Sequence, residues 1–164
     1  YSSSKASADM ITRSFNKTYG INTVISRCSN NYGKNQHEEK LIPKIIYSLK
    51  NEKSFKLYGD GLNVRDWICV TDHCEAIDLI FKKGNNGEIY NIGANNELSN
   101  LEVFHTVYDI IKPIKSAKKL IKFTEDRPGH DRRYSLNTEK IKSNLNWEPK
   151  YKFEEEIKKL VFEE

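Results

Sequence analysis

The chain has 164 residues, of which 37% are hydrophobic and 30% are charged, and its formal net charge is +4. This balance excludes an intrinsically disordered chain, and the length is sufficient for one domain with a hydrophobic core. No apolar run approaches the roughly 18 residues that a membrane-spanning helix needs, so we expect no membrane span.

The first half of the sequence alternates helical and extended patterns. Apolar residues at a spacing near 3.6 predict a first helix that ends at Gly20. Pro43 falls in the first turn of the next helix, where proline is tolerated. In chain order, the expected pieces are a helix over 2–19, a strand over 23–28, a polar loop over 29–38, a helix over 41–49, a strand over 55–58, a glycine turn over 59–61 and an extended piece over 67–70.

The second half continues the alternation with shorter pieces. Ser99 and Glu102 have the spacing of a capping box, which predicts a helix start there. The expected pieces are a helix that begins at Thr71 or Asp72 and ends at Gly84, a strand over 88–92, a helix over 101–111, an extended piece over 121–124, a short helix over 138–145 and an amphipathic helix after Phe153. Because strands alternate with helices, the fold class is α/β. The short pieces suit a small substrate-binding lobe beside a larger parallel sheet.

Tyr1 and Lys5 are the first candidates for catalysis. Because they are four residues apart on a predicted helix, both side chains lie on one face. A nearby lysine ammonium stabilises a tyrosine phenolate, which lets the tyrosine act as a general base toward a sugar hydroxyl near neutral pH. The same lysine can hydrogen-bond the ribose of a nicotinamide nucleotide. This spacing also occurs often by chance, so the pair alone does not identify an active site.

Asn30 and Asn31 directly follow the predicted strand that ends at Cys28. In α/β sheets, ligands bind beyond the carboxyl ends of the strands. Asparagine amides suit neutral polar groups such as carboxamides and sugar hydroxyls. The alternative interpretation is that the two asparagines only form a turn.

Arginines mark two later segments. Arg65 lies in the segment 58–67, after a glycine turn and beside aromatic residues. A planar guanidinium that never deprotonates is a natural partner for a diphosphate, although an ion pair with Asp66 or Asp72 is the structural alternative. The segment 126–134, Asp-Arg-Pro-Gly-His-Asp-Arg-Arg-Tyr, is the most specific motif. Its three arginines and one histidine repel one another unless an anion or acidic partner is present.

Taken in this order and spacing, the motifs resemble those of the dTDP-glucose 4,6-dehydratases of the extended short-chain dehydrogenase/reductase superfamily. The resemblance extends over essentially the whole sequence. It implies the C-terminal part of a Rossmann-type fold, with its last parallel strands and helices, plus the smaller α/β substrate-binding lobe. Residues 1–35 would be a remnant of the NAD-binding domain. Residues 36–164 would be mainly the nucleotide-sugar-binding lobe with interleaved Rossmann elements.

The resemblance also implies roles for individual residues. Tyr1 would be the base that helps NAD oxidise the C4 hydroxyl of the glucosyl unit, and Lys5 would hold the nicotinamide ribose. Asn30 would face the cofactor and Asn31 the substrate. The residues that would bind the nucleotide and diphosphate come from four segments and are Lys40, Leu41, Lys56, Leu57, Tyr58, Arg65, Asn100, Asp126, Arg127, Pro128, Gly129 and His130.

The implied reaction converts dTDP-glucose to dTDP-4-keto-6-deoxyglucose by oxidation at C4, loss of water across C5–C6 and return of the hydride to C6. In the family, the glycine-rich dinucleotide motif and the acid and base of the dehydration precede the tyrosine, and they are absent from this sequence. We therefore expect a C-terminal fragment that begins at Tyr1 and has no detectable dehydratase activity by itself. Residues 34–39 depart from the aromatic and proline residues usual in the family, which leaves the sugar contacts open.

Three alternatives remain. A UDP-glucose 4,6-dehydratase would share most of these blocks. A nucleotide-sugar 4-epimerase would share Tyr1 and Lys5 but is not expected to carry the arginine-rich segment. In isolation, the chain could act as a non-catalytic nucleotide-sugar-binding unit. The resemblance also implies that the full-length protein is a homodimer, with the helix that starts at Tyr1 in its interface.

Compartment and other partners follow from cysteine and charge patterns. Cys28, Cys69 and Cys74 lack metal-ligand spacing, so no metal site is expected. An odd number of cysteines without a secretory leader predicts reduced thiols in the cytoplasm. The 27 basic residues are interspersed with 23 acidic ones, so no nucleic-acid partner is expected.

Overall fold

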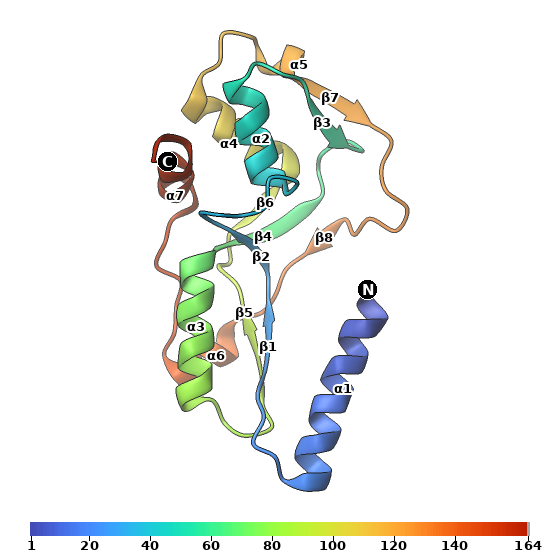
Figure 1. The fold of residues 1–164 in the computed structure, drawn as a ribbon, viewed down its shortest axis with the longest axis vertical. Helices are drawn as coiled ribbons and strands as arrows, with labels where there is room; N and C mark the ends of the chain where they lie inside the picture. Colours follow the sequence, from blue (N-terminus) through green and yellow to red (C-terminus); the bar gives the residue numbers. More distant parts are fainter. Residues whose placement is uncertain (164) are drawn as a thin grey trace.

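In a computed structural model, which describes residues 1–163, the chain forms an elongated α/β structure (Figure 1). The helices are α1 (Ser2–Tyr19), α2 (Leu41–Lys50), α3 (Val70–Lys83), α4 (Asn100–Ile111), α5 (Ala117–Leu120), α6 (Glu139–Leu145) and α7 (Phe153–Phe162). The strands are β1 (Ile25–Cys28), β2 (Asn30–Tyr32), β3 (Phe55–Tyr58), β4 (Val64–Cys69), β5 (Ile89–Ile92), β6 (Glu97–Ser99), β7 (Ile121–Thr124) and β8 (Arg133–Tyr134). Strands alternate with helices, so the expected α/β class is confirmed. None of the helices in this range is long and apolar enough to cross a membrane.

Strands β1 and β5 form a parallel pair at one end of the molecule, with Ile25 opposite Ile89. In Figure 1, α3 lies on one side of this pair and α1 on the other. Because α1 runs back along the strands, its N-terminal end lies toward the carboxyl ends of β1 and β5. This arrangement places Tyr1 at the edge of the sheet where ligands of α/β folds bind.

Strand β4 connects the two ends of the molecule. Its second half pairs with β2 in parallel, with Asn31 opposite Ile68. Its first half pairs with β6 in antiparallel fashion and with β8 in parallel, with Arg65 opposite Tyr134. Strands β3 and β7 form a separate parallel pair at the other end, beside α2, α4 and α5 (Figure 1).

Two hydrophobic clusters stabilise these elements. The larger cluster lies among α2, α4, α7, β3 and β4, and its buried members are Tyr32, Ile42, Ile45, Leu49, Phe55, Leu57, Trp67, Cys69, Val103, Phe104, Val107, Leu120, Phe153, Ile157 and Val161. The smaller cluster lies around β5, α3 and α6, and its buried members are Ile68, Ala76, Ile80, Tyr90, Ile92, Ile141 and Trp147. Helix α1 contributes no buried residue to either cluster.

Several local predictions are confirmed. Gly20 ends α1 in the left-handed conformation with φ 68°. The capping box is present, since the Ser99 hydroxyl accepts from the backbone N–H of Glu102 and the Glu102 carboxylate accepts from the backbone N–H of Ser99. Pro43 lies in the first turn of α2.

Other local predictions are wrong. The segment 29–38 is not wholly a loop, because three of its residues pair with β4 as β2. The extended piece begins at Val64 and ends at Cys69, and α3 starts at Val70. Asp72 does not cap this helix, because its buried carboxylate accepts from the backbone N–H of Lys150 (2.9 Å) and Tyr151 (3.1 Å). Helix α5 and strands β6 and β8 were not anticipated.

Candidate functional site

The candidate nucleotide-binding site begins where β3 and β7 end. The backbone N–H of Gly59, just after β3, donates to the carbonyl of Thr124 at the end of β7 (2.9 Å). Gly59 has φ 59°, and a Cβ built on it would lie 3.0 Å from Oδ2 of Asp126. A residue without a side chain is therefore needed for the close approach of the two chain segments. This contact brings the start of the arginine-rich segment beside Tyr58.

Two arginines of the segment 126–134 form internal ion pairs. Arg132 donates to both carboxylate oxygens of Asp60 at 2.8 and 3.0 Å. Arg133 donates to both carboxylate oxygens of Glu97 at 2.6 and 2.5 Å. These hydrogen bonds hold the pKa of Asp60 and of Glu97 below the usual range for such carboxyl groups. Both arginines therefore fasten the segment to its neighbours.

Arg65 and Arg127 are different, because neither forms an ion pair with a carboxylate among residues 1–163. Arg127 lies over the ring of Tyr58, with 5.8 Å between its guanidinium carbon and the ring centroid. Arg65 donates from Nη1 to the carbonyl of Val64 (2.7 Å). Burial lowers the pKa of Arg65, the nearby Asp131 opposes that shift, and Arg127 adds to it.

The alternative role of Arg65, an ion pair with Asp66 or Asp72, is wrong. The buried carboxylate of Asp66 accepts from the backbone N–H of Ala94 (3.0 Å) and Asn96 (2.8 Å), and the carboxylate of Asp72 accepts from the chain near α7. Neither carboxylate is therefore bound to Arg65. Arg65, which is partly buried, and Arg127 therefore have no bound carboxylate within residues 1–163, and Arg127 is close enough to lower the pKa of Arg65.

The turn over residues 127–130 is stabilised by hydrogen bonds within the segment. Gly129 has φ 67°, and the backbone N–H of His130 donates to the carbonyl of Arg127 (3.2 Å) across Pro128. The Nδ1 atom of His130 lies 2.6 Å from Oδ1 of Asp126, and this hydrogen bond lowers the pKa of the Asp126 carboxyl. The turn is therefore fixed by contacts within itself and by Gly59.

The other expected nucleotide-site residues lie on β3 and at the starts of α2 and α4. Lys56 is exposed on β3, whereas the side chain of Leu57 is buried in the larger cluster. Asn100 begins α4, and its backbone N–H donates to the carbonyl of Asn63, which directly precedes β4 (3.1 Å). Lys40 precedes α2 and forms an ion pair with Glu39 (3.2 Å), and Leu41 is the first residue of α2.

Tyr1 is the N-cap residue of α1, and the backbone N–H of Lys5 donates to its carbonyl (3.0 Å). The Lys5 ammonium lies 5.9 Å from the centroid of the Tyr1 ring, and Tyr1 is 94% exposed. The helix is attached to the β1–β5 pair mainly by polar contacts. Arg27 of β1 donates to Asp9 at 2.5 and 2.9 Å, and the Asn16 side chain donates to the carbonyl of Ile21 (2.9 Å). No other described residue covers the phenol and the ammonium as a pair.

Asn30 and Asn31 are adjacent on β2 but differ in their contacts. The side chain of Asn30 makes no hydrogen bond within residues 1–163, whereas that of Asn31 is fully engaged. Its Nδ2 donates to the carbonyl of Ser29 (3.2 Å) and approaches the sulfur of Cys28 (3.4 Å). Its Oδ1 lies 2.8 Å from Nδ1 of His73, a residue that no sequence pattern marks as functional.

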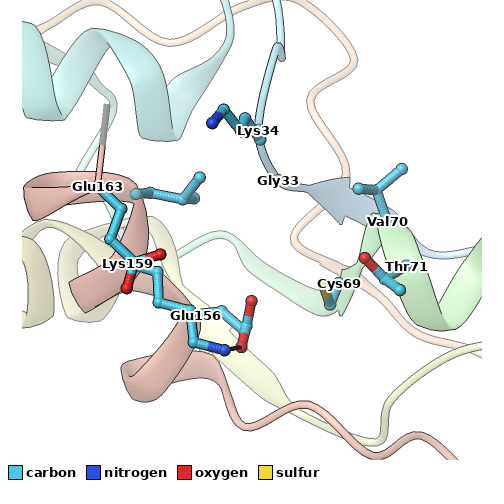
Figure 2. A pocket seen from close by; sticks show the side chains of 9 residues that line it. Gly33, Lys34, Cys69, Val70, Thr71, Glu156, Lys159 and Glu163 are labelled. Atoms are coloured by element: carbon cyan, nitrogen blue, oxygen red, sulfur yellow. Dashed lines mark hydrogen bonds and ion pairs between the residues drawn. The ribbon is translucent and has the colours of Figure 1, made fainter.

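Two cavities are present, and neither is lined by Arg65 or Arg127. Figure 2 shows one of about 180 Å³ between α7, the start of α3 and the loop after β2, lined by Gly33, Lys34, Cys69, Val70, Thr71, Glu156, Lys159, Leu160 and Glu163. The other, of about 470 Å³, is lined by Asn95, Glu97, Arg133, Ser135, Leu136, Asn137, Thr138 and Glu139. Glu156 and Lys159, both on α7, form an ion pair at one wall of the first cavity (2.6 Å). Neither cavity is lined by a residue expected to bind the cofactor or substrate.

Comparison with known proteins identifies relatives along nearly the whole chain. The family model described as GDP-mannose 4,6 dehydratase matches residues 1–160. The low-salt glycan biosynthesis protein Agl12 of Haloferax volcanii is 45% identical over 98% of the chain and 51% of its own length. A dTDP-glucose 4,6-dehydratase of Escherichia coli is 44% identical over 98% of the chain and 46% of its own length.

A solved structure gives the same result. The dTDP-glucose 4,6-dehydratase of Bacillus anthracis, in complex with NAD, has 52% sequence identity and a TM-score of 0.92. That match covers 98% of this chain and 50% of the solved chain. The chain thus spans about half the length of the relatives that it matches. Since the family model covers residues 1–160, the chain belongs to the family described as GDP-mannose 4,6 dehydratase, and the most similar relatives named here include dTDP-glucose 4,6-dehydratases.

Proposed function

We propose that the chain carries the tyrosine–lysine pair and most of the nucleotide-sugar pocket of an NAD-dependent dTDP-glucose 4,6-dehydratase. The observation that carries this proposal is the division of the arginines. Arg132 and Arg133 are neutralised by Asp60 and Glu97, whereas Arg65 and Arg127 keep their guanidinium groups available. The identity to enzymes of this activity supports the same proposal.

A diphosphate would be bound by the two available guanidinium groups, which are close enough for Arg127 to lower the pKa of Arg65. Partial burial strengthens a charge-assisted hydrogen bond, and Arg65 is partly buried. Arg127 lies over the ring of Tyr58 and is exposed, so its N–H groups are available to donate to phosphate oxygens. The pocket would therefore bind the substrate by its diphosphate, which leaves the sugar free to extend toward α1.

The residues of α1 fit a nicotinamide nucleotide. The phenol of Tyr1 and the ammonium of Lys5 are exposed together, and both groups are suited to ribose and sugar hydroxyls. The amide of Asn30 is also without a partner in the described chain and would face the cofactor. When bound, NAD supplies a place for the C4 hydride until it is returned at C6. Tyr1 would take the proton of the C4 hydroxyl, and the Lys5 ammonium would stabilise the phenolate from which this base acts.

The proposal also covers the nucleotide of the substrate, the cellular location and the oligomeric state of the full-length protein. We propose dTDP-glucose as the substrate, with UDP-glucose as the alternative nucleotide. A cytoplasmic location agrees with three cysteines that form no disulfide. A homodimer agrees with the exposed apolar side chains of α1, which are Met10, Ile11, Phe15 and Tyr19.

Product analysis tests the proposal. The complete gene product that contains this chain is incubated with dTDP-glucose, UDP-glucose and GDP-mannose, and the products are identified by mass spectrometry. We expect loss of water, 18 mass units, with dTDP-glucose as the preferred substrate. A C4 epimer of unchanged mass would instead identify an epimerase, and binding of nucleotide sugar without turnover would identify a non-catalytic unit.

A matched pair of arginine variants tests the role of the pocket. Arg65→Gln should raise KM for the nucleotide sugar by about 10- to 100-fold, because a charge-assisted contact to phosphate is lost. Arg13→Gln removes an equal charge from the exposed surface of α1 and should leave KM unchanged. Equal KM values for both variants would contradict diphosphate binding by Arg65.

A further inference from the structure

The orientation of the Asn31 amide is fixed by its surroundings. The carbonyl oxygen of Ser29 lies 3.2 Å from Nδ2 of Asn31, and a carbonyl oxygen can only accept a hydrogen bond. If the amide were rotated by 180°, two oxygen acceptors would face each other at this distance. The amide nitrogen therefore points to Ser29 and Cys28, and Oδ1 points to the ring of His73 at 2.8 Å.

This orientation determines which ring nitrogen of His73 carries a proton. Because Oδ1 of Asn31 accepts, Nδ1 of His73 must be the donor. Burial lowers the pKa of His73 below its usual value, so the ring is neutral at pH 7 and has one proton. With that proton on Nδ1, Nε2 keeps a lone pair.

The fold brings these two residues together, although they are 42 positions apart in the sequence. Asn31 lies opposite Ile68 in the β2–β4 ladder, and α3 begins at Val70, directly after β4. His73 lies near the start of α3, so its side chain is close to Asn31 on the neighbouring strand β2. The Gln36 side chain separately donates to the backbone carbonyl of Asn31 (2.8 Å), so the backbone position does not depend on His73.

We propose that His73 is a positioning residue that fixes the side-chain amide of Asn31 by donating a hydrogen bond from Nδ1. The inference rests on the proposed function, in which Asn31 faces the nucleotide sugar. Without a donor at position 73, the amide is held only through its nitrogen, by Ser29 and Cys28, and its oxygen loses its partner in a partly buried place. The second lone pair of Oδ1, with which Asn31 would accept from the substrate, would then no longer be held in one direction.

Two substitutions of equal shape test the inference in the complete gene product. His73→Asn places an amide NH₂ at the branch point where Nδ1 is attached, so it can still donate to Asn31. His73→Asp has the same shape but offers only acceptors at neutral pH. We expect kcat/KM to stay within about 3-fold of the unchanged protein for the Asn variant and to fall at least about 10-fold for the Asp variant. His105→Leu, an exposed histidine on α4, is the control and should behave as the unchanged protein.

A double-mutant cycle separates positioning from general stability. In an Asn31→Ala background, His73→Asp should have little further effect on kcat/KM, because there is no amide left to position. Equal losses for the Asn and Asp variants, or full additivity with Asn31→Ala, would overturn the inference.

Nitrogen-15 NMR of the imidazole decides the hydrogen bond independently of activity. At pH 7.5 we expect a protonated Nδ1 and an unprotonated Nε2 for His73, and a changed Nδ1 signal in Asn31→Ala. The opposite tautomer would overturn the inference even in a fully active enzyme. If none of the nucleotide sugars is turned over, the proposed function fails, and the NMR result still decides whether His73 holds Asn31.

Discussion

Gly93 lies where the loop after β5 passes closest to the buried carboxylate of Asp66. A Cβ built on Gly93 would be 2.3 Å from Oδ2 of Asp66. This carboxylate holds the backbone N–H groups of Ala94 and Asn96. We expect Gly93→Ala to lower the free energy of unfolding by about 2 kcal/mol, because the carboxylate must move away from its donors. Urea unfolding followed by circular dichroism measures this loss.

Gly20→Ala is the control for the added methyl group. Gly20 has φ 68°, and a Cβ there would meet nothing within 4 Å, so only the cost of the left-handed backbone, roughly 1 kcal/mol, is expected. A loss for Gly93→Ala no greater than that for Gly20→Ala would show that the contact with Asp66 does not limit position 93.

Sequence patterns do not distinguish between two adjacent asparagines that have different contacts in the structure. Asn30 and Asn31 are chemically identical neighbours, and the sequence marks both as candidate ligands. Their difference comes from His73 and from the carbonyl of Ser29, which occupy the Asn31 amide and leave that of Asn30 available. No sequence pattern predicts a role for His73, because its spacing from other residues matches neither a metal-binding nor a catalytic motif.

The arginine-rich segment 126–134 is held by carboxylates on other elements. Hydrogen bonds from Arg132 and Arg133 lower the pKa of Asp60 and Glu97. A carboxyl group with a lowered pKa contributes stability above its unfolded pKa, and this contribution is lost as the pH falls through the folded value. We therefore expect the contacts of Arg132 and Arg133 with these two carboxylates to hold from pH 7 to 5 and to loosen below about pH 4. Amide resonances of residues 126–134, followed by NMR from pH 7 to 3, measure this transition.

Glu97→Gln isolates one of these contacts. The glutamine side chain cannot ionise, so the part of the segment near Arg133 should be loosened at pH 7 as it is in the unchanged protein at low pH. An acid transition of the same size and midpoint in this variant would show that Glu97 is not the titrating group.

Some helices and strands can be predicted from nearby residues in the sequence, and others cannot. Helices α1 and α4 could be predicted because Gly20 and the Ser99–Glu102 capping box act within one turn of the chain. Strands β2, β6 and β8 have two or three residues each and exist only by pairing with β4. A propensity summed over so few residues is weaker than the hydrogen bonds to a distant partner.

Helix α1 stands apart from the two hydrophobic clusters of the molecule. It has no buried residue, and its described ties include the Asp9–Arg27 ion pair and the contacts of Asn16. Helix α4, by contrast, buries Val103, Phe104 and Val107. Because local stability follows buried apolar contact, amides of α1 should exchange with deuterium at least about tenfold faster than those of α4. Hydrogen exchange of the 164-residue chain, read by mass spectrometry, measures the difference.

Asp9→Ala should increase the exchange of α1 further and leave α4 unchanged, since the ion pair to β1 is lost. Protection of α1 equal to that of α4 would contradict this expectation. A dilution series would then distinguish a second copy bound to the apolar face of α1, whose protection falls on dilution, from an intrinsically stable helix, whose protection does not.

The sequence alone determined the α/β class, the caps that bound α1 and α4, and the motifs that carry the family resemblance, because each depends on residues close together in the chain. Only the tertiary structure decided which arginines remain available. Asp60 and Glu97 lie 72 and 36 positions from the arginines that they neutralise. Likewise, His73 reaches Asn31 only because β2 pairs with β4. Charge pairing and hydrogen bonding depend on distance in space, and strand pairing sets that distance for residues far apart in sequence.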